Sequence, residues 1–331
     1  MPGFPRLQPE YDFVILGGGH AGLQAGLKAA LLHFTAAIVS RGPKYGRSYY
    51  APKMDNIPGF PDGISGHNLL DLQVKALGAW ESRVGYFTPA RAVAARREGD
   101  RFEVEFEWLA RRHTVKGRVL LLALGVVDRI PEVAGKIDPI FPWANQALVD
   151  FCELCDSHEL PGRTVGVLGH DAFAARLALN LRHFGPTSLE ILTHGRPFLE
   201  GAETSERRRL LDELQAAQIT VVETPMTGFD GIREKRWTVK FADGTERSYD
   251  RGFSGLGWYS MNSELPRSLG AAFDAEGYVA VDLDQRVLAA EGGAAIPGLY
   301  CAGDLATGWN QIPAAWASAE RAVIHAYSEY L

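Results

Sequence analysis

The stretch that decides the fold is YDFVILGGGHAG, residues 11–22 of a chain of 331. Its first half is rich in aromatic and β-branched residues, as is typical of a buried strand, and runs directly into the turn Gly17-x-Gly19-x-x-Gly22. Small and apolar residues at helical spacing follow over 20–33, and residues 36–39 predict the next strand. This order is typical of a mononucleotide-binding unit, in which the helix N-terminus offers unpaired N–H groups to a phosphate.

One expected part of this unit is changed. The end of the second strand usually carries an acid for the ribose hydroxyls, whereas this chain has Ser40-Arg41 there. A serine hydroxyl can still form a hydrogen bond, so the match is weakened without being broken. We therefore keep Ser40 and Arg41 among the candidate cofactor contacts.

A second strand–turn–helix unit starts at residue 164, with Gly169 at its turn and an alanine-rich helix predicted over 172–184. Chain that continues well beyond this unit indicates that one domain is inserted into another. We expect an α/β fold of two Rossmann-like three-layer domains. The first domain would comprise residues 1–125 and 252–331, and the inserted one residues 126–251.

Between the two units lies Cys152-Glu-Leu-Cys155, followed by Asp156 and His158. Closely spaced cysteines work as a redox pair when one thiolate attacks a disulfide and the second resolves the mixed disulfide. Asp156 or His158 can shuttle the proton that accompanies electron transfer to sulfur. Two other interpretations stay open: a zinc half-site with His158, which needs further ligands, and two inert buried cysteines. A dithiol between two dinucleotide-type units favours a flavin enzyme that exchanges electrons with sulfur.

Composition excludes several other classes. The net charge of −6 leaves no basic surface of the kind that nucleic acid requires. The longest uninterrupted apolar run, residues 119–127, is under half of a membrane span, and the first ten residues lack the apolar core of a signal peptide. Three cysteines are too few for a disulfide scaffold. We expect a cytoplasmic protein that binds neither nucleic acid, nor membrane, nor a metal.

With these motifs in place, the sequence resembles the thioredoxin reductase family of FAD-dependent pyridine nucleotide-disulfide oxidoreductases along nearly the whole chain. Five motifs carry the resemblance: GGGHAG at 17–22, NIPGFPDGISG at 56–66, ALGVVDRIP at 123–131, CELCD at 152–156 and GLYCAGDLATGWNQI at 298–312. The last of them is the most specific. The resemblance implies an FAD-binding domain with an inserted NAD(P)-binding-like domain that carries the CxxC motif, and it implies a homodimer.

The resemblance also implies roles for the redox residues. Cys155 matches the cysteine that faces the flavin, Cys152 the one that exchanges with the substrate disulfide, and Asp156 the acid. The implied partner is a thioredoxin-like protein or a small-molecule disulfide or dithiol.

For FAD, the resemblance implies that Gly303 and Asp304 hold the ribityl and phosphate region. Asn56 would lie beside the isoalloxazine ring, with Gln311 and Ile312 near its pyrimidine edge. The full set of expected cofactor contacts is Gly17, Gly19, His20, Ala21, Gly22, Ser40, Arg41, Arg47, Asn56, Gly125, Gly303, Asp304, Asn310, Gln311 and Ile312.

The second nucleotide unit departs from the family's NADPH-binding pattern, G-x-G-x-x-A. The turn reads Gly169-His-Asp171-Ala-Phe-Ala174, so an aspartate replaces the middle glycine. A carboxylate about 4 Å from a phosphate charge costs roughly 4 kcal/mol at an effective dielectric constant of about 20. After the next strand the family has paired arginines for the 2′-phosphate, whereas this chain has His194-Gly-Arg196. Both changes make NADPH a doubtful electron donor, with a divergent but working NADPH site as the alternative.

Arg47 lies in the loop 46–50, where the family usually has a neutral amide or a small residue. With Tyr49, Tyr50 and Trp309 it would make the flavin surroundings more cationic and more aromatic. These aromatic residues either pack within the protein or stack on the flavin or on a second aromatic ligand in the space that nicotinamide would use.

The sequence thus predicts an FAD-dependent thiol–disulfide oxidoreductase that passes electrons between flavin, the Cys152–Cys155 dithiol and a disulfide or dithiol partner, without ordinary use of NADPH. Three enzymatic alternatives stay open: an NADPH-dependent thioredoxin reductase, an oxidase of small dithiols that uses oxygen, and a reductase supplied by ferredoxin. A flavin-binding sensor or interaction module is the non-enzymatic alternative, which the intact dithiol and its acid disfavour.

Overall fold

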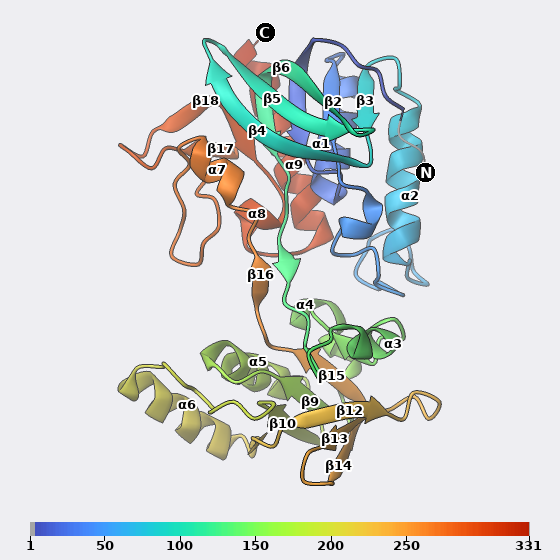
Figure 1. The fold of residues 1–331 in the computed structure, drawn as a ribbon, viewed down its shortest axis with the longest axis vertical. Helices are drawn as coiled ribbons and strands as arrows, with labels where there is room; N and C mark the ends of the chain where they lie inside the picture. Colours follow the sequence, from blue (N-terminus) through green and yellow to red (C-terminus); the bar gives the residue numbers. More distant parts are fainter. Residues whose placement is uncertain (1–3, 331) are drawn as a thin grey trace.

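The computed structural model describes residues 4–330, which form two lobes joined by two extended linkers (Figure 1). The linkers contain the short strands β7 (Val127–Asp128) and β16 (Trp258–Ser260), which pair antiparallel to each other. The chain leaves the first lobe through β7 and returns to it through β16.

The first domain is built on an eight-stranded sheet whose centre is parallel, in the order β18-β6-β1-β2-β3. These strands are β1 (Glu10–Leu16), β2 (Ala36–Val39), β3 (Val84–Phe87), β6 (Arg111–Leu122) and β18 (Ala295–Cys301). The register sets Leu16 beside Val39 and Leu122, and Leu122 beside Cys301. The carboxyl ends of four strands therefore meet at one edge of the sheet, where ligands bind in open α/β folds.

Both faces of this sheet are covered, which explains why the central strands are apolar throughout. Phe13 and Ile15 of β1 pack on the face that carries the helices α1 (His20–Leu31), α2 (Gly66–Gly78) and α9 (Ile312–Tyr330). Val14 and Leu16 pack on the opposite face, under an antiparallel layer. The remaining elements of this domain are β4 (Ala90–Glu98), β5 (Arg101–Trp108), β17 (Arg286–Leu288), α7 (Glu264–Ser268), α8 (Asp304–Thr307) and the 3₁₀ turn η1 (Pro43–Tyr45).

The second domain has a five-stranded parallel sheet in the order β11-β10-β9-β15-β8. Its strands are β8 (Val149–Asp150), β9 (Thr164–Leu168), β10 (Ser188–Leu192), β11 (Thr220–Val222) and β15 (Arg251–Ser254). Helices α5 (Ala172–Arg182) and α6 (Thr204–Ala216) pack on it, and a three-stranded sheet of β12 (Met226–Asp230), β13 (Trp237–Phe241) and β14 (Glu246–Tyr249) adjoins it. Short helical turns lead into and out of the cysteine pair: η2 (Asp138–Ile140), α3 (Phe141–Ala144), α4 (Glu153–Asp156) and η3 (Ser157–Glu159).

The expected α/β fold of two Rossmann-like domains is confirmed. The chain returns to the first domain only after β15, because β15 pairs with β9 and β8 and so belongs to the second sheet. We therefore propose that the inserted domain extends through Ser254, a few residues beyond the boundary at 251 expected from the sequence. Among residues 4–330, no helix combines the length and the apolar character needed to span a bilayer.

Candidate active site

The glycine turn after β1 leaves an open cradle at the start of α1. A Cβ on Gly17 would collide with the carbonyl oxygen of Ala123, and one on Gly22 with the carbonyl oxygen of Gly17, so both positions require glycine. A Cβ on Gly19, in contrast, would meet no atom within 4 Å. No side chain of the described residues caps α1, so its first N–H groups face this open side. Such a helix start fits a pyrophosphate.

Ser40 and Arg41 follow β2, and only Ser40 packs against this turn. Ser40 is buried, its hydroxyl accepts a hydrogen bond from the Gly42 N–H at 3.1 Å, and it lies directly under Gly18. Arg41 is exposed, and its guanidinium lies 4.1 Å from the centre of the Tyr45 ring. Ser40 thus supports the turn, while Arg41 stays at the surface.

His20, at the start of α1, is held as a neutral ring. Its Nε2 lies 2.7 Å from the hydroxyl of Ser48, and its Nδ1 contacts the side-chain oxygen of Gln73. Burial lowers the pKa of His20 to about 4, and the contact with Gln73 only partly opposes this. Ala21, the next residue, is buried against the core.

The C-terminal motif reaches the same edge of the sheet. Gly303 has φ 77°, and its N–H donates a hydrogen bond to the buried hydroxyl of Ser318 at 3.0 Å. Asp304 and Ile312 are the first residues of α8 and α9. Asn310 donates weakly to the Tyr278 hydroxyl, but its side-chain oxygen is buried and accepts no hydrogen bond from any described residue. This orphaned acceptor is available to a donor on a ligand.

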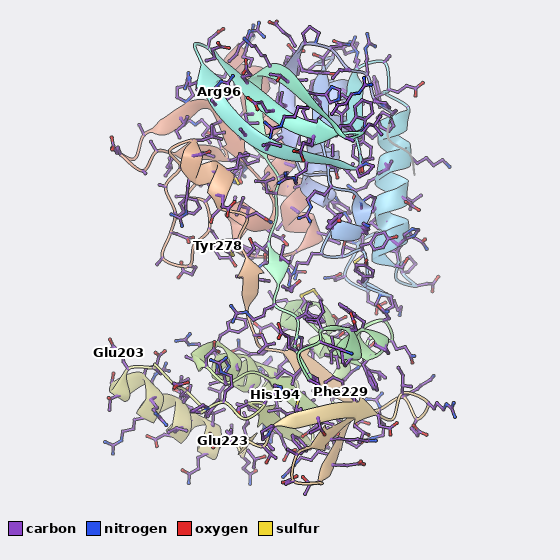
Figure 2. All side chains as sticks on the ribbon, viewed as in Figure 1. Arg96, His194, Glu203, Glu223, Phe229 and Tyr278 are labelled. Carbon is purple, nitrogen blue, oxygen red and sulfur yellow. A yellow bond between two sulfur atoms is a disulfide. The ribbon has the colours of Figure 1, made fainter. Side chains whose placement is uncertain are left out.

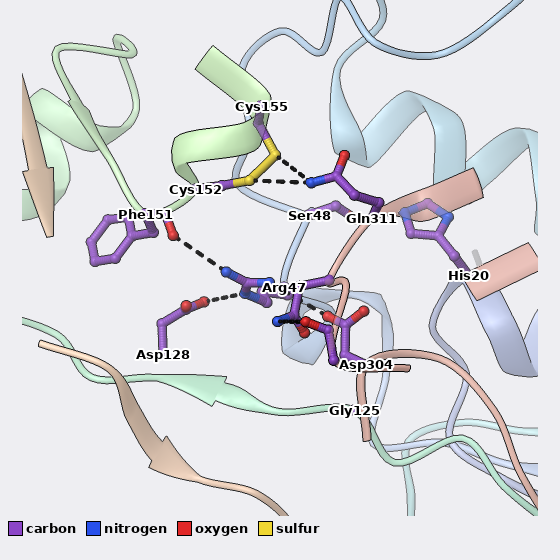
Figure 3. A network of polar contacts seen from close by, with 12 residues as sticks. His20, Arg47, Ser48, Gly125, Asp128, Phe151, Cys152, Cys155, Asp304 and Gln311 are labelled. Atoms are coloured by element: carbon purple, nitrogen blue, oxygen red, sulfur yellow. Dashed lines mark hydrogen bonds and ion pairs between the residues drawn. A yellow bond between two sulfur atoms is a disulfide. The ribbon is translucent and has the colours of Figure 1, made fainter. Parts of the chain in front are cut away.

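The two cysteines form a disulfide, and it lies against this motif. Cys152 is the N-cap of α4, and Cys155 lies within its single turn. The side-chain nitrogen of Gln311 lies 3.5 Å from the sulfur of Cys152 and 3.4 Å from that of Cys155 (Figure 3). The oxygen of the same amide accepts a hydrogen bond from Asn56 at 3.0 Å. The structure therefore brings the cysteine pair together with two residues expected beside the flavin.

Arg47 connects the two domains at the centre of the site (Figure 3). Its Nε donates to Asp128 of β7 at 2.7 Å, and its two other nitrogens contact Asp304 at 3.5 Å and the carbonyl oxygen of Phe151 at 3.3 Å. Its guanidinium also lies 4.7 Å from the centre of the Trp258 ring, on β16. Burial lowers the pKa of Arg47, but the two carboxylates outweigh burial and raise it overall.

Gly125, Tyr49 and Trp309 were also expected near the flavin, and each makes other contacts or faces solvent. Gly125 has φ 61°, and its carbonyl oxygen accepts a hydrogen bond from Asn262 at 2.9 Å. Tyr49 packs edge-on against Tyr50 and His67 rather than against Arg47. Trp309 is 71% exposed. Within the described residues, the aromatic ring that joins Arg47 is therefore Trp258.

The two candidate proton carriers differ in their surroundings. Asp156 is half-buried, and burial raises the pKa of its carboxyl, whereas Arg251 and His158 oppose the rise. His158 is exposed, and its Nε2 lies 4.0 Å from Asp55 of the first domain. Of the two, Asp156 has the environment of a carboxyl group that retains a proton.

The second glycine turn differs from the first at its helix start. Gly169 packs tightly against Ala174 and Gly255, as a βα turn requires. Asp171, however, is the N-cap of α5, and its carboxylate accepts a hydrogen bond from the Ala174 N–H at 3.1 Å. The anion-binding position of α5 is thus filled by the chain's own carboxylate.

The region expected to meet a 2′-phosphate is also engaged within the protein. His194 has φ 55°, and its Nδ1 accepts a hydrogen bond from the Met226 N–H at 2.8 Å. Arg196 is exposed. Figure 2 labels His194 together with Glu223, which accepts a hydrogen bond from the N–H of Phe198 at 3.1 Å.

Sequence reasoning missed four charged residues of this site: Asp55, Asp128, Asp150 and Arg251. Asp128 lies within the quoted ALGVVDRIP motif, which is the signal that could have found it. The other three lie outside any chemical pattern: Asp150 is two residues before Cys152, whereas folding brings Asp55 and Arg251 to the segment that contains the cysteines.

The fold and this site together define the class: a two-domain, thioredoxin reductase-like oxidoreductase with a disulfide beside its nucleotide edge. The family model described as pyridine nucleotide-disulphide oxidoreductase matches residues 11–319, and the chain belongs to this family. The family is one of flavin-dependent oxidoreductases that act on disulfides, in agreement with the enzyme class expected from the sequence.

Relatives and solved structures agree with this. The chain is 31% identical over 169 residues to a thioredoxin reductase of Borreliella burgdorferi, a match that covers 49% of this chain and 48% of that protein. It thus spans about half the length of the relatives that it matches first. It is 25% identical to a thioredoxin reductase of Listeria innocua over 89% of this chain and 86% of that protein. The fold matches thioredoxin reductase from Streptococcus pyogenes with a TM-score of 0.79 and 20% identity, over 97% and 98% of the two chains.

Proposed function

We propose that this chain is an FAD-dependent thiol–disulfide oxidoreductase that passes electrons between flavin, the Cys152–Cys155 disulfide and a disulfide or dithiol partner. The contact of Gln311 with both sulfurs carries this proposal, since Gln311 is expected at the flavin ring. When bound, FAD would supply two-electron transfer.

The described residues fit this cofactor. The open, uncapped start of α1 suits a pyrophosphate, and the free oxygen of Asn310 suits a donor on the ligand. Gly303 and Asp304 would hold the ribityl and phosphate region, and Asn56, Gln311 and Ile312 the ring. We propose that the remaining residues expected from the sequence also contact the cofactor: Gly17, Gly19, His20, Ala21, Gly22, Ser40, Arg41, Arg47 and Gly125.

The cysteine pair performs the exchange with the partner. Reduction breaks the S–S bond and takes up two electrons and two protons. The thiolate of Cys152 then attacks the partner disulfide and releases one partner thiolate, which takes up a proton. Cys155 attacks the sulfur of Cys152, releases the second partner thiol and restores the internal disulfide. The reverse sequence oxidises a partner dithiol, with oxygen as the final acceptor.

We propose Asp156 as the proton carrier for these sulfurs, with His158 as the second candidate. Asp156 follows Cys155 directly, and its raised pKa lets it hold a proton closer to neutral pH than an exposed aspartate does. His158 is exposed, so solvent reaches its ring, and its Nε2 lies 4.0 Å from Asp55.

We also propose that NADPH is not the ordinary electron donor. A pyrophosphate at α5 would have to displace the Asp171 cap and then face its charge, at roughly 4 kcal/mol for a separation of about 4 Å. Ferredoxin or a dithiol would then supply the electrons. The partner would be a thioredoxin-like protein or a small disulfide or dithiol, and the active form a homodimer.

An NADPH-dependent thioredoxin reductase is the second candidate. It is favoured by the relatives of the chain, which are thioredoxin reductases and match it over as much as 98% of their length. In this case the Asp171 carboxylate would turn outward when NADPH binds.

One anaerobic experiment separates the two. The purified flavoprotein is titrated with NADPH, with NADH and with a small dithiol, and bleaching of the flavin absorbance is recorded. We expect rapid bleaching by the dithiol and slow or no bleaching by NADPH. Rapid, stoichiometric bleaching by NADPH would instead establish the second candidate, and bleaching by no donor would defeat the enzymatic proposal.

Asp171 has its own test by direct binding. The variant Asp171→Gly removes both the cap and the charge, whereas Asp171→Asn keeps a capping oxygen and removes only the charge. If Asp171 blocks the site, NADPH affinity measured by calorimetry rises in both variants, and more in Asp171→Gly. Unchanged affinity in both would show that this carboxylate does not exclude NADPH.

A further inference from the structure

Gln311, the residue before α9, contacts both reacting sulfurs with one end of its side-chain amide and Asn56 with the other. The amide nitrogen lies 3.5 Å from the sulfur of Cys152 and 3.4 Å from that of Cys155. The amide oxygen accepts a hydrogen bond from the side-chain nitrogen of Asn56 at 3.0 Å. In the reaction described so far, Gln311 is only a neighbour of the flavin ring, and Asn56 has no task at the sulfurs.

The chemistry of the sulfurs decides which way this amide faces. A disulfide has no hydrogen to donate, so an amide beside it offers a hydrogen bond only through its nitrogen. Gln311 is half-buried. If its amide were turned over, its oxygen would face two sulfurs without a hydrogen, and a half-buried oxygen that accepts nothing is costly. The donor on Asn56 therefore favours the orientation that presents the Gln311 nitrogen to the sulfurs.

The cysteine segment is held on its own side of this contact. Arg47 donates to the carbonyl oxygen of Phe151, the residue before Cys152, at 3.3 Å. The cysteines belong to the inserted domain, whereas Gln311 and Asn56 come from the first domain, so the contact crosses from one lobe to the other (Figure 3). Both sides are thus anchored, and a donor held in this way acts without reorganisation when charge appears on its acceptor.

We propose that Gln311 is a catalytic hydrogen-bond donor to the thiolate that forms when the disulfide opens, and that Asn56 is the positioning residue that orients it. The inference rests on the proposed function, because it assigns a task within the same disulfide exchange. Opening the S–S bond takes up two electrons; one sulfur binds a proton and the other stays a thiolate. The electrons come from reduced flavin in the proposed function, or from an added dithiol.

The hydrogen bond from Gln311 gains strength when its acceptor becomes charged. A disulfide sulfur is a weak acceptor, whereas a hydrogen bond to an ionised group is roughly twice as strong as a neutral one. The donor therefore stabilises the reduced state more than the disulfide, and a couple whose reduced form is stabilised is the stronger oxidant. We expect an effect of about tenfold on the equilibrium constant for reduction, which corresponds to about 30 mV for a two-electron couple.

The first measurement is the redox equilibrium of the full-length holoprotein with dithiothreitol at neutral pH. The reduced fraction is read from the cysteines that react with a thiol label after an acid quench. Gln311→Leu should lower the equilibrium constant for reduction about tenfold, and Asn56→Ala should lower it less, because the amide is then free to turn. Gln215→Leu replaces an exposed glutamine on α6 and is the matched control, which should equal the wild type.

The second measurement reports the thiolate directly. Thiolates rather than thiols react with iodoacetamide, so the pH dependence of alkylation of the reduced protein follows their formation. Gln311→Leu should move the midpoint of this profile to higher pH by about one pH unit, the same tenfold effect. Gln311→Met repeats the substitution with an unbranched side chain, should the leucine variant fail to fold in circular dichroism.

Asn56 is tested in two backgrounds, because a positioning residue acts only through the residue that it positions. Asn56→Ala should shift the equilibrium constant in the wild type and add nothing in Gln311→Leu. Equal effects in the two backgrounds would overturn the positioning role of Asn56. A Gln311→Leu protein with the wild-type equilibrium constant and the wild-type midpoint would overturn the donor. If the expected shifts occur in a protein that exchanges electrons with neither flavin nor any partner, the proposed function fails and the donor stands.

Discussion

Replacing Arg47 by methionine tests whether this residue joins the two domains. Its side chain is 18% exposed and lies between Asp128 at 16% and Asp304 at 19%. Methionine keeps the length of the side chain but leaves both carboxylates without their cation and the Phe151 carbonyl without its donor. Removing one partner of a buried ion pair costs about 3–5 kcal/mol, and a lost hydrogen bond about 1 kcal/mol. Because these groups retain some solvent, we expect a loss of about 3 kcal/mol of unfolding free energy.

The assay is urea unfolding of the full chain, followed by circular dichroism, together with the rate at which the reduced cysteines are alkylated. We expect Arg47→Met to unfold at lower urea and its cysteines to react faster, because the loop before Cys152 loses its anchor. Arg96→Met is the matched control, because Arg96 pairs with Glu103 and Glu105 while its side chain is 58% exposed. Asp128→Asn added to Arg47→Met should restore part of the lost stability. The reasoning fails if Arg47→Met unfolds at the same urea concentration as Arg96→Met.

Further predictions concern the sulfurs and the titrating groups. Cys155→Ser should retain FAD, read from its absorbance, and lose thiol turnover; turnover at the parent rate would refute its role. Gln311→Leu should bind FAD but reduce its disulfide more slowly in stopped-flow absorbance, since both sulfurs lose their amide neighbour. The pKa of His20 is about 4 when folded against about 6.5 unfolded, so stability should fall by up to about 3 kcal/mol as pH drops through this window; His20→Gln should lack this loss in pH-dependent melting. Burial and the neighbouring Asp156 raise the pKa of Asp150, which has the opposite consequence. The stability of the wild type relative to Asp150→Asn should fall as pH rises above about 4. A difference in melting temperature between the two proteins that is the same at pH 5 and at pH 8 would contradict this.

The parts of the fold that could be predicted from sequence are those fixed by neighbouring residues. The strand before Gly17 and the helix after Gly19 follow from a local pattern of apolar and small residues, and the structure has them where expected. The pairing of Cys152 with Cys155 likewise needs no more than a helical turn to bring the sulfurs together.

The charged contacts at the site could not be predicted in this way, because they join distant segments. Arg47 and Asp128 are 81 residues apart in sequence, and no period or motif relates them. The same holds for Asp55 and His158, which come from different domains. For Arg47 the sequence indicated an unusual cation near the flavin, but only the three-dimensional structure identifies its carboxylate partners.

Asp171 shows how a correct observation can have a second meaning. From the sequence, its carboxylate counts as a missing glycine in a phosphate-binding turn. The same residue stands three positions before Ala174 at a helix start, which is the spacing of an N-cap. That spacing alone predicts the hydrogen bond from the Ala174 N–H to the Asp171 carboxylate.

The difference between the N-termini of α1 and α5 also bears on the stability of the two lobes. The inserted lobe caps the N-terminus of α5 with its own carboxylate, whereas α1 has no side-chain cap among the described residues, a place that the phosphate of the proposed FAD would take. If FAD fills the start of α1 as proposed, a preparation without FAD should melt in two steps, with the N-terminal lobe unfolding first. The proposal thus implies that flavin supply affects the stability of one lobe and not of the other.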